Sequence, residues 1–156
     1  MGGPCLVDGT MRPELDNFLQ CAFELDGKQW TSAEQYFQAV KFTDEAYREK
    51  IRACHDGGAC WQLGNSRAFQ LRADWESVKV DVMYSANCAK FEQNAALRDA
   101  LLATRGSITA YGFPFWVKWN AVLLERIREE LRPAAERDEA ALAERRAAMA
   151  AYHDSA

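Results

Sequence analysis

The sequence has no apolar run that approaches the ~20 residues needed to cross a bilayer as a helix, so no membrane partner is expected. Its opening stretch, MGGPCLVDGT, lacks the basic start and apolar core of a secretory signal. The five cysteines are an odd number and nowhere form a C-x-x-C pair, which favours reduced thiols over a disulfide framework. We therefore expect a cytoplasmic or nuclear protein in a reducing compartment.

Metal ligands, cofactor motifs and positive charge are also scarce. There are only two histidines, and Cys54-His55 and Cys60 show no repeated ligand spacing, so no metal site is expected. No glycine-rich dinucleotide motif is present, so no cofactor is expected. The net charge of −4 argues against a broad basic face for gripping a duplex. A nucleic-acid partner would have to be engaged locally, at a pocket.

What the sequence does contain indicates a globular domain. Hydrophobic residues make up 49% of the 156 residues and aromatic residues 12%, which is enough for a sizeable core. The apolar periodicity predicts six or seven helices with two or three short strands, an α+β class that is mostly α. We expect a single compact domain over residues 1–132. From 133 to 156 the composition shifts to Ala, Glu and Arg, which predicts a C-terminal helical extension packed through Leu142 and Met149.

The expected elements follow from turn, cap and periodicity signals. Residues 1–14 are expected to form a loop around a short strand at 5–7, and Asp26-Gly27 predicts a hairpin. Gly64 is expected to close a helix, and Asp74 and Asn94 are expected to cap helices. The periodicity predicts helices over 32–42, 44–53, 59–63, 74–91, 95–103 and 118–131, an irregular segment over 65–73, a strand over 107–111 and an aromatic loop over 112–116.

The most informative stretch is WTSAEQYFQAVKF, residues 30–42. Thr31-x-x-Glu34 and Ser32-x-x-Gln35 both fit the capping-box spacing, so the helix start is marked twice. At 100° per residue the apolar side chains gather on one stripe, and the two glutamines are predicted to face water. The stripe consists of Ala33, Tyr36, Phe37 and Val40, and the glutamines are Gln35 and Gln38.

Glu34 and Lys41 lie two helical turns apart, on one edge of the apolar stripe beside Phe37. An acid and an amine at the rim of an apolar face are what a catalytic pocket needs. Each residue also has an ordinary interpretation. Glu34 fits the third position of a capping box, and Lys41 fits a cation that complements the helix dipole.

Several segments share their order and spacing with a known family. They are Leu15-Asp16-Asn17-Phe18, FELDGKQW (23–30), SAEQYFQAVKF (32–42), WQLGNSR (61–67), LRADWESVK (71–79), AKFEQN (89–94) and LRDALLAT (97–104). Together they resemble the NADAR family of YbiA-like N-glycosidases, from about residue 15 to 132. The sequence departs from the family at Gln35, where members usually have histidine. It also departs at 115–120, where a glycine-rich segment is missing.

The resemblance implies cleavage of an N-glycosidic bond between ribose C1′ and an amino-bearing base. It further implies a lysine that forms a Schiff base with C1′, and the matching residue is Lys41. We hypothesise that Glu34 acts as the acid that opens the sugar ring or protonates the leaving base. Asp74 is an alternative acid, although its position before a helix favours a capping role.

The resemblance leaves the substrate open. ADP-ribose attached to guanosine in DNA or RNA is preferred, ribosylamino-pyrimidine phosphates of riboflavin synthesis are the alternative, and a non-catalytic ADP-ribose-binding module is the alternative of another class. A monomer is expected. Three kinds of binding residue are expected. Aromatic rings that line the pocket are expected from Phe18, Trp30 and Trp116, and amides that bind sugar hydroxyls or base edges from Asn17 and Asn120. Cations that bind phosphate are expected from Arg67, Arg72 and Lys90, the last of which is either structural or phosphate-binding.

Overall fold

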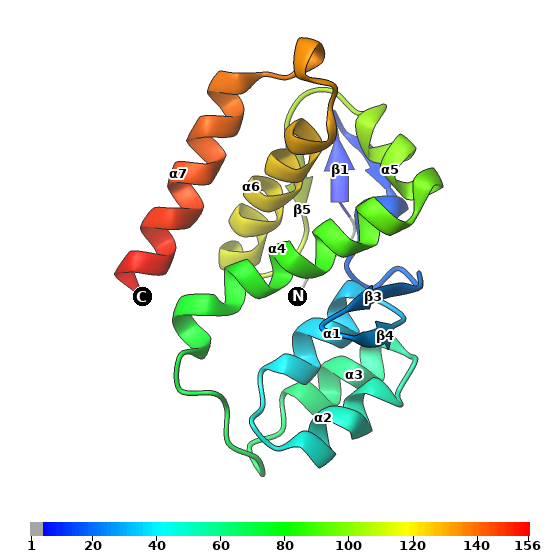
Figure 1. Ribbon diagram of the computed structural model, residues 1–156, viewed down its shortest axis with the longest axis vertical. Coiled ribbons are helices and arrows are strands. Elements are labelled where there is room, and N and C mark those ends of the chain that lie inside the picture. The colour runs from blue at the N-terminus through cyan, green and yellow to red at the C-terminus, as the bar shows by residue number, and fades with distance from the viewer. Residues whose placement is uncertain (1–4) are drawn as a thin grey trace.

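The long helix α4 crosses the middle of the protein, seen here in a computed structural model that describes residues 5–156 (Figure 1). It packs against α1 on one side and against α5, α6 and α7 on the other. The helices are α1 (Ala33–Val40), α2 (Glu45–Arg52), α3 (Gly57–Gly64), α4 (Trp75–Gln93), α5 (Ala95–Leu102), α6 (Pro114–Leu131) and α7 (Glu139–Ser155), with short 3-10 turns at Pro13–Leu15 and Ala134–Glu136. Within the described residues, no helix is both long and apolar enough to span a bilayer.

Two small antiparallel sheets complete the α+β fold, and each contains a hairpin turned on an Asp-Gly pair. Asp8-Gly9 and Asp26-Gly27 all have positive φ, as a tight two-residue turn requires. The strands are β1 (Cys5–Val7), β2 (Thr10–Arg12) and β5 (Ile108–Ala110) in the order β2-β1-β5, and β3 (Phe23–Leu25) paired with β4 (Lys28–Trp30).

The predicted strands at 5–7 and 107–111 and the predicted hairpin are therefore confirmed, with slightly different bounds. Strand β2 was missed, because the glycine after Asp8 was interpreted as an interruption rather than as a hairpin turn. Residues 1–4 of the predicted N-terminal loop lie outside the described residues.

The predicted aromatic loop over 112–116 is wrong in its second half, because α6 begins at Pro114 rather than near Lys118. Proline fits the first helical position, where its missing N–H is not needed. Helix α3 also begins earlier than predicted, at Gly57, because the Asp56 carboxylate accepts a hydrogen bond from the Ala59 N–H at 2.7 Å.

Two predicted caps bond elsewhere. The Asp74 side chain makes no capping hydrogen bond to α4 and binds Arg72 instead. The Asn94 side chain makes none to α5, and donates to the carbonyls of Ala22 and Lys90. Both residues do precede the first residue of a helix. Their side chains, however, bond to residues other than the first N–H groups of that helix.

All eight residues of α1 are buried, so the prediction that Gln35 and Gln38 face water is wrong. Helix α1 is enclosed by α2, α3 and α4, which leaves it no solvent face. Gln35 compensates by accepting from the Thr31 N–H and by donating to the carbonyls of Arg52 and Cys54, each at 2.8 Å. The predicted cap is confirmed, since Ser32 Oγ accepts from the Gln35 N–H at 3.0 Å.

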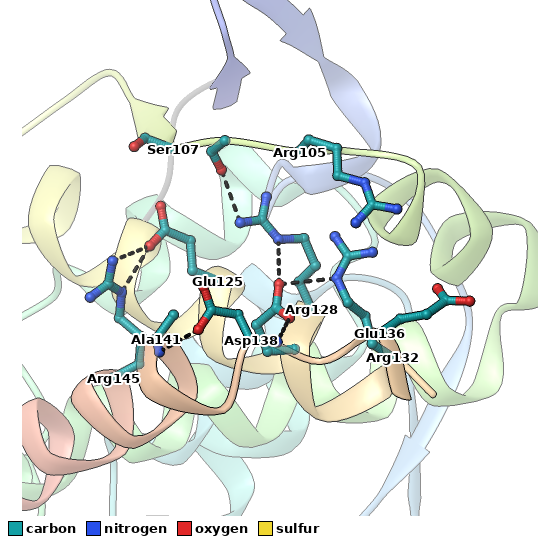
Figure 2. A pocket seen from close by; sticks show the side chains of 11 residues that line it. Arg105, Ser107, Glu125, Arg128, Arg132, Glu136, Asp138, Ala141 and Arg145 are labelled. Carbon is teal, nitrogen blue, oxygen red and sulfur yellow. Dashed lines mark hydrogen bonds and ion pairs between the residues drawn. The ribbon is translucent and has the colours of Figure 1, made fainter. Parts of the chain in front are cut away.

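Polar contacts fasten α7 to α6 around a cavity of about 330 Å³ (Figure 2). Glu129 accepts from Nε of Arg132 and from the backbone N–H of Asp138, both at 3.0 Å. Glu125 accepts from Nε of Arg145 at 2.8 Å. None of the predicted site residues lines this cavity, which is bounded by Arg105, Gly106, Ser107, Glu125, Arg128, Glu129, Arg132, Glu136, Asp138, Ala141 and Arg145.

Truncation of Met149 tests how firmly α7 belongs to the core. Met149 is 2% exposed and packs into the hydrophobic core, whereas Met11 on β2 is 52% exposed. We expect Met149→Ala to lower the free energy of unfolding by ~2–4 kcal/mol, because it leaves a cavity. The matched control Met11→Ala is expected to change it by no more than about 0.5 kcal/mol. Urea unfolding measures both, and equal effects would contradict the packing described for α7.

Candidate active site

Lys41 directly follows α1 and is held by the last residue of α3 and by the loop that joins α3 to α4. Its side chain is enclosed, leaving the residue 8% exposed, and its Nζ donates to the carbonyl of Gly64 at 3.1 Å. The Lys41 carbonyl accepts from the Arg72 N–H at 2.8 Å, so backbone and side chain are both fixed. Lys41 makes no ion pair with any residue from 5 to 156.

Burial lowers the pKa of Lys41 to about 8, from 10.5 for an ordinary lysine. The negative charge of Glu34 raises the pKa again and the positive charge of Arg67 lowers it, but desolvation is the largest of these effects. At pH 7 about a tenth of such an amine is neutral, compared with about one part in three thousand for an ordinary lysine. Lys41 is therefore both enclosed and partly available as a nucleophile.

Glu34 lies fully buried in the first turn of α1. Its Oε1 accepts from Nε2 of Gln38 at 2.5 Å, and its backbone N–H donates to the Asn17 carbonyl at 2.9 Å. Gln38 packs against Gly64 so closely that a Cβ on Gly64 would lie 1.8 Å from Gln38 Oε1. Gly64 is the last residue of α3, so the predicted helix end is confirmed, and the close approach of Gln38 is what requires glycine there.

A chain of buried amides connects three segments beside Glu34. Asn87 Nδ2 on α4 donates to Asn17 Oδ1 at 2.9 Å, and Asn17 Nδ2 donates to Asn120 Oδ1 on α6 at 3.0 Å. Asn17 also accepts the Glu34 N–H through its carbonyl. The two predicted asparagines are thus bonded to each other and joined to α1.

Aromatic rings line the side of Lys41 that faces α4 and α6. The Lys41 Nζ lies 5.6 Å from the ring centroid of Phe37 and 6.0 Å from that of Trp75. Phe37 packs edge to face against Trp75 and Trp116, with centroids 4.9 and 5.2 Å apart. Trp116 therefore lies one ring away from the amine.

The other two predicted aromatic walls have different surroundings. Trp30 is 2% exposed, its indole N–H donates to the Leu25 carbonyl at 2.9 Å, and its ring packs on Tyr36. Trp30 is a core residue in this structure. Phe18 is half-buried and lies against α3, where a Cβ on Gly57 would be 2.7 Å from its ring.

Arg72 and Asp74 bind each other through two hydrogen bonds of 2.6 and 2.8 Å. The Arg72 guanidinium lowers the pKa of Asp74, and a carboxyl with a lowered pKa is a poor proton donor. Of the two predicted acids, Glu34 is therefore the better suited.

The remaining predicted cations differ in exposure. Lys90 is fully buried, and its Nζ donates to the Asp16 carbonyl at 2.9 Å, which ties α4 to the segment before Asn17. Arg67 is exposed on the loop between α3 and α4, and its guanidinium donates to the Asn65 carbonyl at 3.1 Å.

Sequence reasoning missed four residues that shape this site. Trp75 and Asn87 fall within the helix predicted over 74–91 and were assigned no role, Gln38 was predicted to face water, and Gly64 was expected only to close a helix. A buried asparagine on the core face of α4 was the one available signal, because an unpaired buried amide is costly. Among residues 5–156, no group of His, Cys, Asp or Glu side chains is placed to hold a metal ion.

Comparisons with known proteins show which family this chain resembles. The NADAR domain family matches residues 9–120. N-glycosidase YbiA of Escherichia coli K12 is 48% identical over 91 residues, which is 58% of this chain and 57% of YbiA. An N-glycosidase of Nostoc punctiforme is 32% identical over 130 residues, 74% of this chain and 83% of that protein. A riboflavin biosynthesis protein of Vibrio vulnificus is 37% identical over 90 residues, 58% of this chain and 24% of that protein.

The solved structure of E. coli YbiA shows the same fold. It superimposes with a TM-score of 0.70 at 39% identity, covering 76% of this chain and 77% of that one. The fold is thus that of the YbiA-like proteins, mostly helical with few short strands, as predicted. The chain belongs to the NADAR family, so the predicted resemblance is also confirmed.

The pKa of Lys41 can be measured by NMR titration of the lysine side chains. Burial lowers the pKa to about 8 for both Lys41 and Lys90, so two shifted titrations are expected. A Lys41→Arg variant should remove one of them and so assign it. A Lys41 titration near the ordinary 10.5 would contradict the enclosure of the amine.

Gly64→Ala tests the close packing between α1 and α3. The new methyl must displace the Gln38 amide, so we expect a loss of ~1–3 kcal/mol in the free energy of unfolding. Gly58→Ala in the same helix is the matched control, because its Cβ would lie 3.2 Å from the nearest atom, Asp56 Oδ1. Urea unfolding compares them, and a Gly64→Ala variant as stable as the control would refute the contact.

Proposed function

We propose that this chain is an N-glycosidase that cleaves the bond between ribose C1′ and an amino-bearing base through a Schiff base on Lys41. The observation that carries the proposal is the enclosed Lys41 amine, hydrogen-bonded to the neutral Gly64 carbonyl and with a pKa of about 8. Such an amine is neutral often enough to attack carbon near neutral pH. The names of the N-glycosidase relatives support this class of reaction.

The reaction begins with opening of the ribose ring. The ring oxygen takes a proton as its bond to C1′ breaks, and C1′ becomes doubly bonded to the nitrogen of the base. Glu34 supplies that proton in the proposal, because it lies fully buried on the same edge of α1 as Lys41.

The neutral Lys41 amine then adds to C1′, and the base leaves with its amino group and a proton. This transimination leaves C1′ in a Schiff base with Lys41. Water adds to the carbon–nitrogen double bond, which releases the sugar as an aldehyde and restores the amine. The addition step needs Lys41 to be neutral, so where this step limits the rate, the rate should rise with pH up to a pH of about 8 and then level off.

The preferred substrate is ADP-ribose attached to guanosine in DNA or RNA. The rings of Phe37, Trp75 and Trp116 beside the amine suit the stacking of an additional ring system. The second candidate is a ribosylamino-pyrimidine phosphate, which is favoured by the similarity to a riboflavin biosynthesis protein of Vibrio vulnificus. Either substrate presents an exocyclic amine on C1′.

The experiment incubates the protein with an ADP-ribosylated guanosine oligonucleotide and, separately, with the ribosylamino-pyrimidine phosphate. Release of ADP-ribose or loss of the pyrimidine riboside is followed by mass spectrometry. Lys41→Met is expected to lower the rate by ~10³-fold or more, because it removes the nucleophile. Lys118→Met, which alters an exposed lysine, is the control and should keep the wild-type rate.

Borohydride during turnover should add the sugar mass to Lys41 of the wild type and add nothing in Lys41→Met. Trapping that persists in that variant would move the nucleophile elsewhere. Tight binding of ADP-ribose without release of any product would favour the non-catalytic binding module instead.

A further inference from the structure

The aromatic wall beside Lys41 leads to a second lysine, Lys79 on α4. The Lys79 Nζ lies 4.3 Å from the ring centroid of Phe115, and Phe115 packs edge to face against Trp116 at 5.1 Å. Trp116 contacts Phe37, the ring nearest to the Lys41 amine. One continuous row of rings therefore has an amine at each end.

The position of Lys79 on its helix agrees with this geometry. Lys79 follows Trp75 by four residues on α4, so the two side chains project from the same face. Trp75 lies within 6.0 Å of the Lys41 Nζ. In addition, the positive charges of Lys79 and Arg67 both lower the pKa of Lys41, after the larger effect of burial.

Lys79 can exchange its present partner. It pairs with Glu76 at 2.5 Å, but the Glu76 side chain is 74% exposed, and exposed ion pairs contribute little. A phosphate offers more acceptor oxygens than a carboxylate, and a terminal phosphate also carries more negative charge. The Lys79 side chain is itself only 17% exposed, so its stem is already ordered before a ligand binds.

Two of the cations predicted for phosphate are occupied elsewhere. Arg72 is held by two hydrogen bonds to Asp74, and Lys90 is fully buried against the Asp16 carbonyl. Arg67 remains at the rim, exposed and bonded only to carbonyls of its own loop among the described residues. Lys79 and Arg67 thus stand on α4 and on the α3–α4 loop, the two segments that enclose Lys41.

We propose that Lys79, together with Arg67, binds the 5′-phosphate of the ribosyl substrate and so places C1′ at the Lys41 amine. The inference rests on the proposed N-glycosidase function and adds to it the residues that would bind the phosphate on the ribose. That chemistry is common to the terminal ribose of ADP-ribose and to a ribosylamino-pyrimidine phosphate. Phosphate binding at a distance from the reacting carbon converts binding energy into orientation.

The test uses sugars that carry an aldehyde in their open form and need no bond cleavage. The wild type is incubated with ribose, ribose 5-phosphate or ADP-ribose together with cyanoborohydride, and labelling of Lys41 is measured by mass spectrometry. We expect ribose 5-phosphate to label Lys41 at concentrations about tenfold or more below those needed for ribose. The comparison of ribose 5-phosphate with ADP-ribose distinguishes the two sources of the phosphate.

The variants separate a phosphate contact from a structural role. Lys79→Met should remove most of the preference for the phosphorylated sugar, because it lowers labelling by ribose 5-phosphate far more than labelling by ribose, whereas Lys79→Arg should retain the preference. Lys118→Met is the matched control, because the Lys118 Nζ also lies over an aromatic ring, at 4.9 Å from Trp119. An undiminished preference in Lys79→Met, or an equal loss with both sugars, would overturn the inference.

A failure of the proposed function is recognised separately. If the wild type prefers ribose 5-phosphate but releases no base from either substrate, the result supports the phosphate site and contradicts the proposed N-glycosidase activity. If no sugar labels the wild type, NMR titration with inorganic phosphate decides the inference alone. Shifts at Lys79 that saturate, and that vanish in Lys79→Met, support it, and their absence refutes it.

Discussion

The hydrogen bond from the Lys41 amine to the Gly64 carbonyl is the constraint on which the site depends. A buried amine must donate to something, and a carboxylate in this place would hold it in the charged form. A backbone carbonyl accepts from a neutral amine as well as from an ammonium. Desolvation can therefore lower the pKa further than the nearby charge of Glu34 raises it.

This bond depends in turn on the enclosure of α1. The Gly64 carbonyl reaches Lys41 only because α3 packs directly on α1, and that approach is possible only because Gly64 has no side chain against Gln38. The close packing buries Gln38 and Glu34 together, and Gln38 Nε2 donates to Glu34 Oε1 at 2.5 Å. The position of the Lys41 amine, the burial of Glu34 and the packing of α1 against α3 therefore depend on one another.

Local signals in the sequence were sufficient for much of the fold. The Ser32 cap, the apolar stripe of α1 and the Asp26-Gly27 turn depend on neighbouring residues alone, and each is present. The prediction from periodicity that Gln38 faces water was wrong, because helices distant in the sequence pack on α1 and bury it. Of the site, Glu34 and Lys41 share one helix and could be paired from sequence. Trp75, Asn87 and Gly64 belong to other helices than Glu34 and Lys41, so no short sequence spacing relates them to these two residues.

The C-terminal helix takes part in this arrangement although it lies beyond the part of the chain that the family matches, residues 9–120. The Tyr152 ring packs on Trp119 and Phe115, with centroids 4.9 and 5.7 Å apart, and its hydroxyl donates to the Glu76 carbonyl on α4. Phe115 is also the ring over which the Lys79 amine lies. Because Tyr152 of α7 packs on Phe115, the contacts that hold α7 on the domain also fix one end of the row of rings that extends to Lys41.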